Sequence, residues 1–259
     1  NVQRLDVKQL LVTMRSQNVN TGFMSPSVWK RLLRYCRSEN KKIPSSVKFT
    51  ASGGSPLHPK FHSEIIDCFD SQFGQHISVY ALTEGLPLAS IGSYEVLNNC
   101  SKWTKIGGGI CLGRAIDGLK VKITPLSFIN NDEVSAFHDN DADNLDSDTL
   151  LLCCPNPKEI INKNAAFQKF GEISLSGNNL TLGSNKYHDT GDVGYLDLAD
   201  RIWLCGRKSH IVRSKSGRFL CSVALESIVN YLPSIEQCAL VSSIEGRVVL
   251  FIEPTVLFG

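Results

Sequence analysis

The apolar positions of the first 80 residues predict alternating helices and strands. Ser25 is suited to cap a helix that has Pro26 at its first position. Apolar residues then recur at helical spacing, and Lys and Arg occupy the opposite, solvated face: Val28, Trp29, Leu32, Leu33, Cys36. Residues 46–52 alternate like a strand, a second helix begins at Pro59, and residues 77–80 alternate again. The order helix, strand, helix, strand predicts an α/β fold with layered elements.

The pattern changes from about residue 105 onward. Short alternating runs predict strands at 119–123, 171–177 and 200–206, and the polar, Asp- and Asn-rich span 128–149 is expected to be a loop. After Arg207 the pattern predicts a helix over 222–232 and strands over 238–243 and 247–253. This order is typical of a small α+β domain.

Composition excludes some classes of protein. The chain has 259 residues, 42% of them apolar, and a formal charge of +2 without any basic or acidic block. Charge therefore gives no indication of a nucleic-acid or membrane-surface partner, and no apolar run is long enough to span a bilayer. Nine cysteines without a CxxC pair, including adjacent Cys153 and Cys154, predict reduced thiols and a cytoplasmic location.

Two segments place polar or flexible residues where strands end. ISVYALTEGLPLAS (77–90) begins as a strand and then carries Thr83 and Glu84 before Gly85 and Pro87. SGGSPLHP (52–59) ends a predicted strand in Gly53 and Gly54, which would let a ligand approach the backbone closely. An ordinary strand-to-helix turn is the competing interpretation of the two glycines.

GGGICLGR (107–114) resembles a phosphate-binding loop only at first sight. Its third glycine falls at Gly113 instead of the position that the dinucleotide fingerprint requires, and it lacks the flanking strand and helix. The sequence therefore argues against a dinucleotide site.

Two later segments carry charge. In YHDTGDVGYLD (187–197), Asp189 and Asp192 flank a predicted Thr-Gly turn, and a carboxylate there can accept hydrogen bonds from two ribose hydroxyls. A metal site of His188 with the two aspartates is a weaker alternative, because no second cluster completes it. In CGRKSHIV (205–212), Arg207 directly follows a predicted strand, although a solvated cation would have the same pattern.

The order of these motifs resembles the adenylate-forming superfamily of acyl-CoA synthetases, peptide-synthetase adenylation domains and luciferases. The resemblance runs from about Ser46 to Pro254 through YALTEG, GRAIDGLKVKI, GEISLSG, HDTGDVGYLD and DRIWLCGRKSHIV. TEGLPLASIG and CGRKSHIV are more specifically similar to the olefin β-lactone synthetases, since Ser209 stands where most members carry Asp or Lys.

The resemblance implies an ATP-dependent reaction in which a carboxylate attacks the α-phosphate. Tyr80 would stack on adenine, Thr83 would bind phosphate oxygens, and Glu84 would hold Mg²⁺. Gly53 and Gly54 would line the adenine and acyl side. The remaining implied roles belong to the later motifs: Asp192 accepts the ribose hydroxyls, Arg207 donates to the same sugar, and Ser209 is the hinge of the small domain.

The resemblance also implies the substrates and the domain boundaries. In a β-lactone synthetase the acid is a β-hydroxy acid whose own hydroxyl displaces AMP, whereas a fatty acyl-CoA ligase would use CoA. Residues 1–206 would form part of a large adenylation domain and 207–259 the start of a small one.

Two features of the family pattern are not found in this sequence. No Ser/Thr/Gly-rich phosphate loop ending in Lys-Gly precedes Thr83, and the late lysine of many members would fall beyond Gly259. We therefore expect a chain that needs the amino-terminal part of the adenylation domain, in cis or in trans, for catalysis. A non-catalytic nucleotide-binding or interaction module derived from such an enzyme is the alternative from another class.

Overall fold

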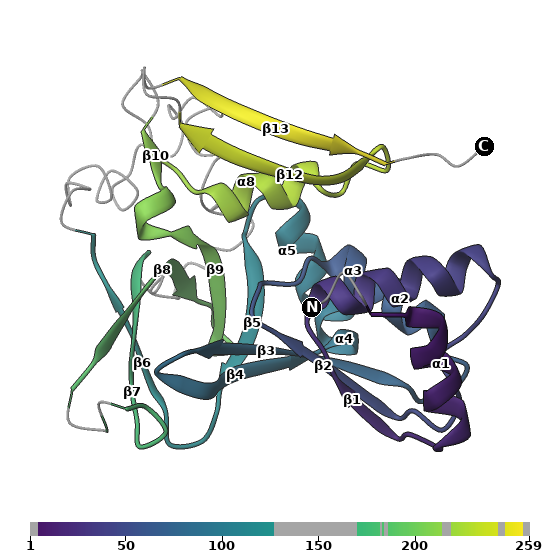
Figure 1. Cartoon of the computed structure of the whole chain (residues 1–259). Helices are drawn as coiled ribbons and strands as arrows, with labels where there is room; N and C mark the ends of the chain where they lie inside the picture. Colours follow the sequence, from purple (N-terminus) through teal and green to yellow (C-terminus); the bar gives the residue numbers. More distant parts are fainter. Residues whose placement is uncertain are drawn as a thin grey trace. The chain divides into compact units, whose positions relative to one another are not determined.

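The computed structural model divides into two compact units. It describes residues 5–126, 170–181, 183, 186–213, 219–242 and 247–255. The first unit comprises Asn1–Ser101 with Leu112–Ile116, and the second comprises Lys102–Cys111 with Asp117–Gly259. Figure 1 labels their elements. The loop expected at 128–149 and the Cys153–Cys154 pair lie outside the described residues.

The first unit alternates helices and strands, as predicted. Its elements are α1 (Val7–Ser16), β1 (Thr21–Phe23), α2 (Pro26–Ser38), β2 (Phe49–Gly53), α3 (Pro59–Cys68), β3 (Gln75–Leu82), β4 (Gly85–Gly92), α4 (Ser93–Glu95), η2 (Val96–Cys100) and the end of β5 (Ile110–Ala115). Strands β1, β2 and β3 are parallel, and β4 runs antiparallel to both β3 and β5. Helices α1, α2 and α3 lie on one side of the three parallel strands (Figure 1).

Helix α2 contributes much of the core of this unit. Its predicted inward positions are all buried, and Trp29 and Leu32 have no exposed surface. They pack with apolar residues of α1 and α3, which include Leu11, Phe61 and Ile65. Ser25 is the residue before the helix, although its side chain makes no capping hydrogen bond to the helix backbone.

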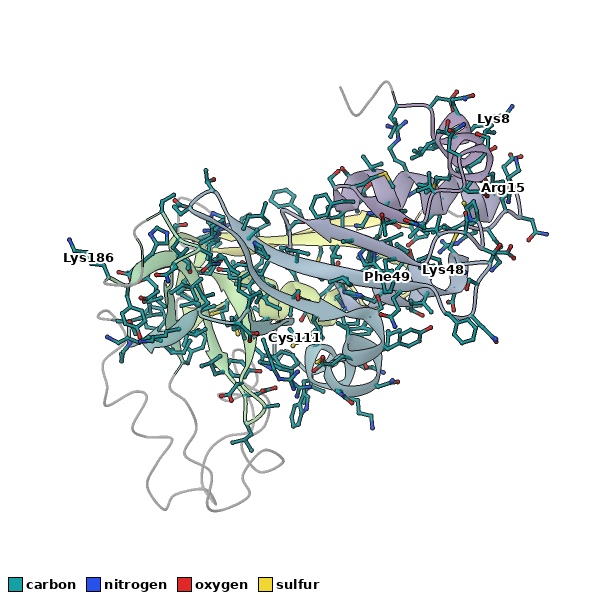
Figure 2. All side chains as sticks on the ribbon, turned by 90° about the horizontal axis from the view of Figure 1, so that it is seen from below. Lys8, Arg15, Lys48, Phe49, Cys111 and Lys186 are labelled. Carbon is teal, nitrogen blue, oxygen red and sulfur yellow. The ribbon has the colours of Figure 1, made fainter. Side chains whose placement is uncertain are left out.

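The cations of the first unit lie on its surface. Arg34 and Arg37 of α2 are exposed, as the solvated face of the helical pattern predicts. Figure 2 shows that Lys8, Arg15 and Lys48 also extend from the ribbon, and all three are exposed. These charges therefore add to solubility and contribute little to the core.

Strand β4 differs from the sequence prediction, in which Gly85 and Pro87 ended the strand pattern. The structure forms an eight-residue strand over these residues. The β3–β4 register shifts between Tyr80 and Leu82, so Pro87 lies where the ladder is irregular. A proline is tolerated at such a bulge because no ladder donor is needed there.

The second unit combines an antiparallel sheet with a small α+β segment. Its elements are α5 (Ser101–Lys105), β6 (Lys120–Thr124), β7 (Gly171–Ser176), β8 (His188–Leu196), β9 (Arg201–Arg207), η3 (Lys208–His210), β10 (Val212–Arg213), β11 (Phe219–Leu220), α8 (Ser222–Val229), β12 (Ile235–Ser242) and β13 (Val248–Pro254). The sheet order is β9-β8-β7-β6. The predicted strands and helix are confirmed, and the helix ends three residues early, at Val229.

Two further observations bear on the class of protein. Six of the seven cysteines that the structure describes are buried, and Cys238 is half-buried. They pack as small apolar residues. Within the described residues, no helix has the length and apolar character needed to cross a membrane.

Candidate functional site

The candidate residues of the first unit gather at one edge of its sheet. Strands β2 and β3 are parallel with Gly53 opposite Val79, so Gly53, Gly54 and the end of β3 share the carboxyl edge. A side chain at Gly53 would meet the Val79 carbonyl oxygen at 3.3 Å, and Gly54 has a positive φ of 96° with open space beside it. Ligands of open α/β sheets bind at this edge. The two glycines thus serve the turn and also leave room for a ligand.

Thr83 and Glu84 form the two-residue turn between β3 and β4. Leu82 pairs with Gly85, which places both side chains at the tip of a tight hairpin. Thr83 is exposed and Glu84 is half-buried. Tyr80, three residues before Thr83, is 9% exposed and pairs with Ala89. A hydroxyl and a carboxylate are therefore held at the end of a rigid strand pair.

The segment around Asp192 is a strand, which corrects the turn expected from Thr190-Gly191. Residues 188–196 form β8, and the register with β7 shifts between Asp189 and Val193. Gly191 has a φ of 73°, as a bulge requires. Thr190 Oγ1 donates to the Ile173 carbonyl oxygen at 2.8 Å and accepts from the Asp192 amide at 3.0 Å. The bulge is thereby fixed.

Asp192 and Arg207, which the resemblance assigns to one sugar, form an ion pair. The two residues are opposite one another on β8 and β9. Arg207 Nε is 2.9 Å from Asp192 Oδ1, and Arg207 Nη1 donates to the Thr190 carbonyl oxygen at 3.0 Å. The Asp192 side chain is 4% exposed and that of Arg207 is 49% exposed.

Ser209 lies in the short helix η3, directly after two anchored residues. Ser209 is exposed, and Lys208 before it forms an ion pair with Glu172, with Nζ 2.6 Å from Oε2. Sequence reasoning missed this pair, because Glu172 was assigned only to the strand GEISLSG. Glu172 lies in a strand that is buried on both faces. A buried charge needs a partner, and this requirement is the signal that points to an ion pair at Glu172.

The glycine-rich segment 107–114 has a packing role. It follows helix α5 and enters strand β5, the reverse of the strand-to-helix order of a phosphate loop. A side chain at Gly109 would approach the Leu204 carbonyl oxygen to 2.3 Å, and one at Gly113 would approach the Ser90 carbonyl oxygen to 2.0 Å. Close approach of neighbouring strands accounts for these glycines.

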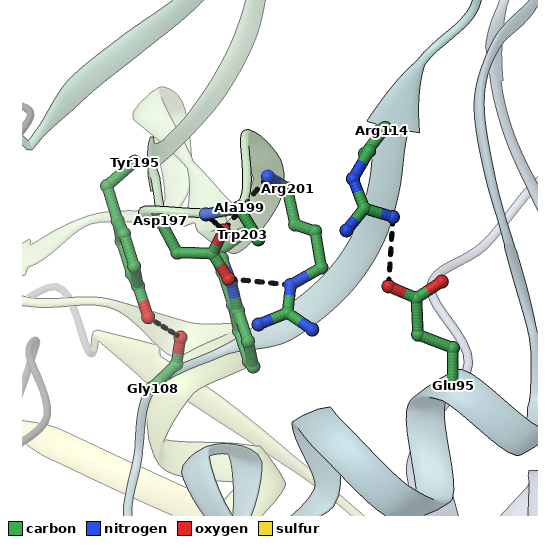
Figure 3. Close-up of polar contacts among 8 residues, drawn as sticks. All are labelled: Glu95, Gly108, Arg114, Tyr195, Asp197, Ala199, Arg201 and Trp203. Carbon is green, nitrogen blue, oxygen red and sulfur yellow. Dashed lines mark hydrogen bonds and ion pairs between the residues drawn. The ribbon is translucent and has the colours of Figure 1, made fainter.

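Several polar contacts brace each unit (Figure 3). In the second unit, Asp197 accepts hydrogen bonds from Trp203 Nε1 at 2.8 Å and Arg201 Nε at 2.7 Å. Burial would raise the pKa of Asp197, but these hydrogen bonds lower it. Tyr195 donates to the Gly108 carbonyl oxygen at 2.9 Å. In the first unit, Arg114 pairs with Glu95 at 3.1 Å.

The alternative metal site gains no support from the structure. In the described part of the chain, no group of three or more His, Cys, Asp or Glu side chains is arranged to hold a metal ion. Asp189 accepts a hydrogen bond from Ser174 Oγ at 2.6 Å, and Asp192 pairs with Arg207.

Comparisons with known proteins agree with the resemblance seen in the motifs. The family described as AMP-binding enzyme matches residues 1–124. The chain is 29% identical over 241 residues to an olefin beta-lactone synthetase of Xanthomonas campestris pv. campestris, covering 91% of this chain and 40% of that protein. A protein of the same name from Stenotrophomonas maltophilia is 27% identical and is covered to 39%.

Solved structures support the fold. The O-succinylbenzoate coenzyme A synthetase of Bacillus subtilis, in complex with ATP and magnesium ion, matches with a TM-score of 0.61 and 17% identity over 96% of this chain and 44% of its own. Coronafacic acid ligase from Pectobacterium brasiliense matches with a TM-score of 0.64 and 14% identity over 99% of this chain and 44% of its own. These likenesses concern the fold, and the chain corresponds to less than half of each of these solved chains.

The resemblance to the adenylate-forming, AMP-binding enzymes is therefore confirmed. Within that class, the more specific similarity to olefin β-lactone synthetases is confirmed by relatives that match over nine tenths of the chain. The chain spans about two fifths of the length of these curated relatives.

Proposed function

We propose that this chain is part of an enzyme that uses ATP to activate a β-hydroxy acid and then closes it to a β-lactone. The observation that carries the proposal is the Asp192–Arg207 pair, fixed across β8 and β9 by the Thr190 bulge. It supplies one acceptor and one donor in a rigid frame. Relatives named olefin beta-lactone synthetase over more than 90% of the chain support the choice of product.

The first step forms an acyl-adenylate. A carboxylate oxygen of the acid attacks the α-phosphorus of ATP, and the bond to pyrophosphate breaks. Thr83 donates its hydroxyl hydrogen to a phosphate oxygen, and the Glu84 carboxylate would hold Mg²⁺, which when bound would neutralise phosphate charge. Both act from a tight turn, so little reorganisation is needed.

The roles proposed for the nucleoside follow the motif matches. Asp192 accepts hydrogen bonds from the ribose hydroxyls, and Arg207 adds a donor to the same sugar. The Tyr80 ring stacks on adenine. Gly53 and Gly54 line the adenine and acyl side, where the absence of side chains leaves room.

The second step is intramolecular. The β-hydroxyl oxygen of the substrate attacks the acyl carbon, its proton passes to a base or to water, and the bond to AMP breaks. Because nucleophile and electrophile belong to one molecule, orientation supplies most of the advantage. Ser209 acts as a hinge at which a small domain, beginning at residue 207, turns between the two steps.

The active enzyme is completed by an amino-terminal part of the adenylation domain, in cis or in trans. The share of the relatives' length that this chain covers, about 40%, supports this proposal. We propose a cytoplasmic location, where ATP and reduced thiols are present.

Two alternative functions differ from the proposed one in whether they need CoA and magnesium. A fatty acyl-CoA ligase would share the first step and require CoA in the second. A protein of Lactococcus lactis named 2-succinylbenzoate--CoA ligase is 34% identical to this chain over 95 residues. A nucleotide-binding module without activity would have no need of Glu84 with its magnesium.

Product analysis separates these candidates. The full-length protein is incubated with ATP, Mg²⁺ and β-hydroxy acids of several chain lengths, with and without CoA, and the products are followed by NMR. We expect AMP and a β-lactone without CoA. A strict requirement for CoA, with a thioester as product, would move the protein to the ligase branch.

A further inference from the structure

The two residues that precede Ser209 are both bound to strands of the sheet. Arg207 contacts Asp192 and the Thr190 carbonyl oxygen on β8. Lys208 extends to Glu172 on β7. Consecutive side chains of one segment thus reach two different strands. The chain is held in place up to residue 208, and Ser209 is the next residue.

Lys208 spans strand β8 to reach its partner. The sheet order is β9-β8-β7, with Arg207 opposite Asp192 and Glu172 opposite Val193. Lys208 Nζ lies 2.6 Å from Glu172 Oε2, and the two residues are 36 positions apart in the sequence. The Glu172 side chain is 10% exposed and that of Lys208 is 43% exposed. A buried carboxylate therefore holds a half-exposed cation.

The surroundings keep Lys208 charged. The hydrogen bond to Glu172 raises the pKa of Lys208, and the charge of Asp189 on β8 acts in the same direction. Asp189 is itself oriented by a hydrogen bond from Ser174 Oγ at 2.6 Å. A methionine at position 208 would keep most of the length of the side chain and lose this attraction.

We propose that Lys208 is a positioning residue, which through Glu172 anchors the chain directly before Ser209 and so confines rotation of the following segment to the hinge. This role rests on the proposed function, in which Ser209 is the hinge between two half-reactions. Without the anchor, the backbone at residue 208 also rotates. The two conformations of the small domain, one for each half-reaction, are then less precisely defined. An anchor of this kind touches neither substrate nor nucleotide.

The test compares the two half-reactions in the full-length protein. Acid-dependent exchange between pyrophosphate and ATP measures the first, and conversion of isolated acyl-adenylate to product measures the second. For Lys208→Met we expect the ratio of the two rates to change at least about fivefold. Lys208→Arg, which retains the charge, should restore the ratio. Arg114→Met, which breaks an ion pair of similar exposure in the first unit, should leave it unchanged.

Hydrogen exchange provides a readout independent of activity. Amides of residues 208–211 should exchange at least about threefold faster in Lys208→Met and Glu172→Gln than in the unaltered protein. An unchanged ratio with unchanged exchange overturns the role of Lys208, and so does an equal loss of both half-reactions. If the unaltered protein shows no acid-dependent exchange of pyrophosphate, the proposed function fails instead, so the two failures are distinguishable.

Discussion

At the scale of single residues, Asp192 combines burial with charge in a way that suits a ligand contact. Its carboxylate is 4% exposed and is paired with an arginine whose side chain is half exposed. A buried carboxylate that served only stability would be an expensive choice, because pairing at best offsets its desolvation. The bulge at Gly191 sets its direction, and a bulge is a common device for aiming a side chain.

Asp192→Asn is predicted to weaken AMP binding by the protein at least tenfold. The variant keeps the size of the side chain and removes the charge that strengthens hydrogen bonds to hydroxyls, worth roughly 1.5–3 kcal/mol. Isothermal calorimetry measures the affinity. Asp189→Asn on the same strand is the matched control and should bind normally. Unaltered affinity in Asp192→Asn contradicts the assignment.

Gly109→Ala is predicted to destabilise the protein by more than about 3 kcal/mol. Gly109 has a φ of 85°, and the new Cβ would lie 2.3 Å from the Leu204 carbonyl oxygen. Gly118→Ala is the matched control, since Gly118 has a similar φ of 81° with nothing within 4 Å. Its cost should be about 1 kcal/mol. Urea denaturation measures both, and equal losses would contradict the packing role.

At the scale of elements, a buried polar network joins the helices of the first unit to its sheet. His76 on β3 lies between hydroxyls of β2, with Nδ1 2.8 Å from Thr50 Oγ1 and Nε2 2.8 Å from Ser52 Oγ. Ser93 Oγ donates to the His76 carbonyl oxygen at 3.1 Å and lies 2.8 Å from His62 Nδ1. Since Ser93 uses its hydrogen on His76, neutral His62 donates from Nδ1.

These histidines predict an acid-labile first unit. Burial lowers the pKa of His62 to about 3 and that of His76 to about 4. In the unfolded chain both have a pKa near 6.5, so the unfolded state binds more protons below that pH and stability falls as the pH decreases. By pH 5 each should cost roughly 2 kcal/mol of the free energy of unfolding.

Urea titrations at pH 7 and pH 5 measure this loss. His62→Gln, whose amide can still donate to Ser93, should show a smaller difference between the two pH values. Exposed His210→Gln should retain the full difference. Equal stability of the unaltered protein at both pH values is incompatible with two buried neutral histidines.

Much of the element order could be predicted, because it depends on local periodicity. The spacing of Trp29 and Leu32 on α2 marks a buried helix face, and the alternation before Gly53 marks β2. Strand β4 could not be predicted, since Pro87 argues against a strand unless the irregular pairing of β4 around it is known. The β8 strand was missed for a similar reason, because Thr190-Gly191 has the composition of a turn.

At the scale of the whole molecule, the contacts between the candidate site residues depend on pairing between strands that are distant in the sequence. Asp192 and Arg207 could be chosen from the sequence, but that they face each other depends on the β8–β9 register. The Glu172–Lys208 contact spans 36 residues and has no local signature. Sequence patterns therefore identify candidate residues, and pairing of distant strands determines their partners.

The measurement that tests the central claim most directly is acid-dependent exchange of radiolabelled pyrophosphate into ATP by the full-length protein, without CoA. Because adenylation is reversible, we expect an enzyme of this class to catalyse exchange that depends on both Mg²⁺ and a β-hydroxy acid. The contradicting result is normal AMP binding without any exchange, tested with acids of several chain lengths. It would exclude adenylation and indicate a nucleotide-binding module.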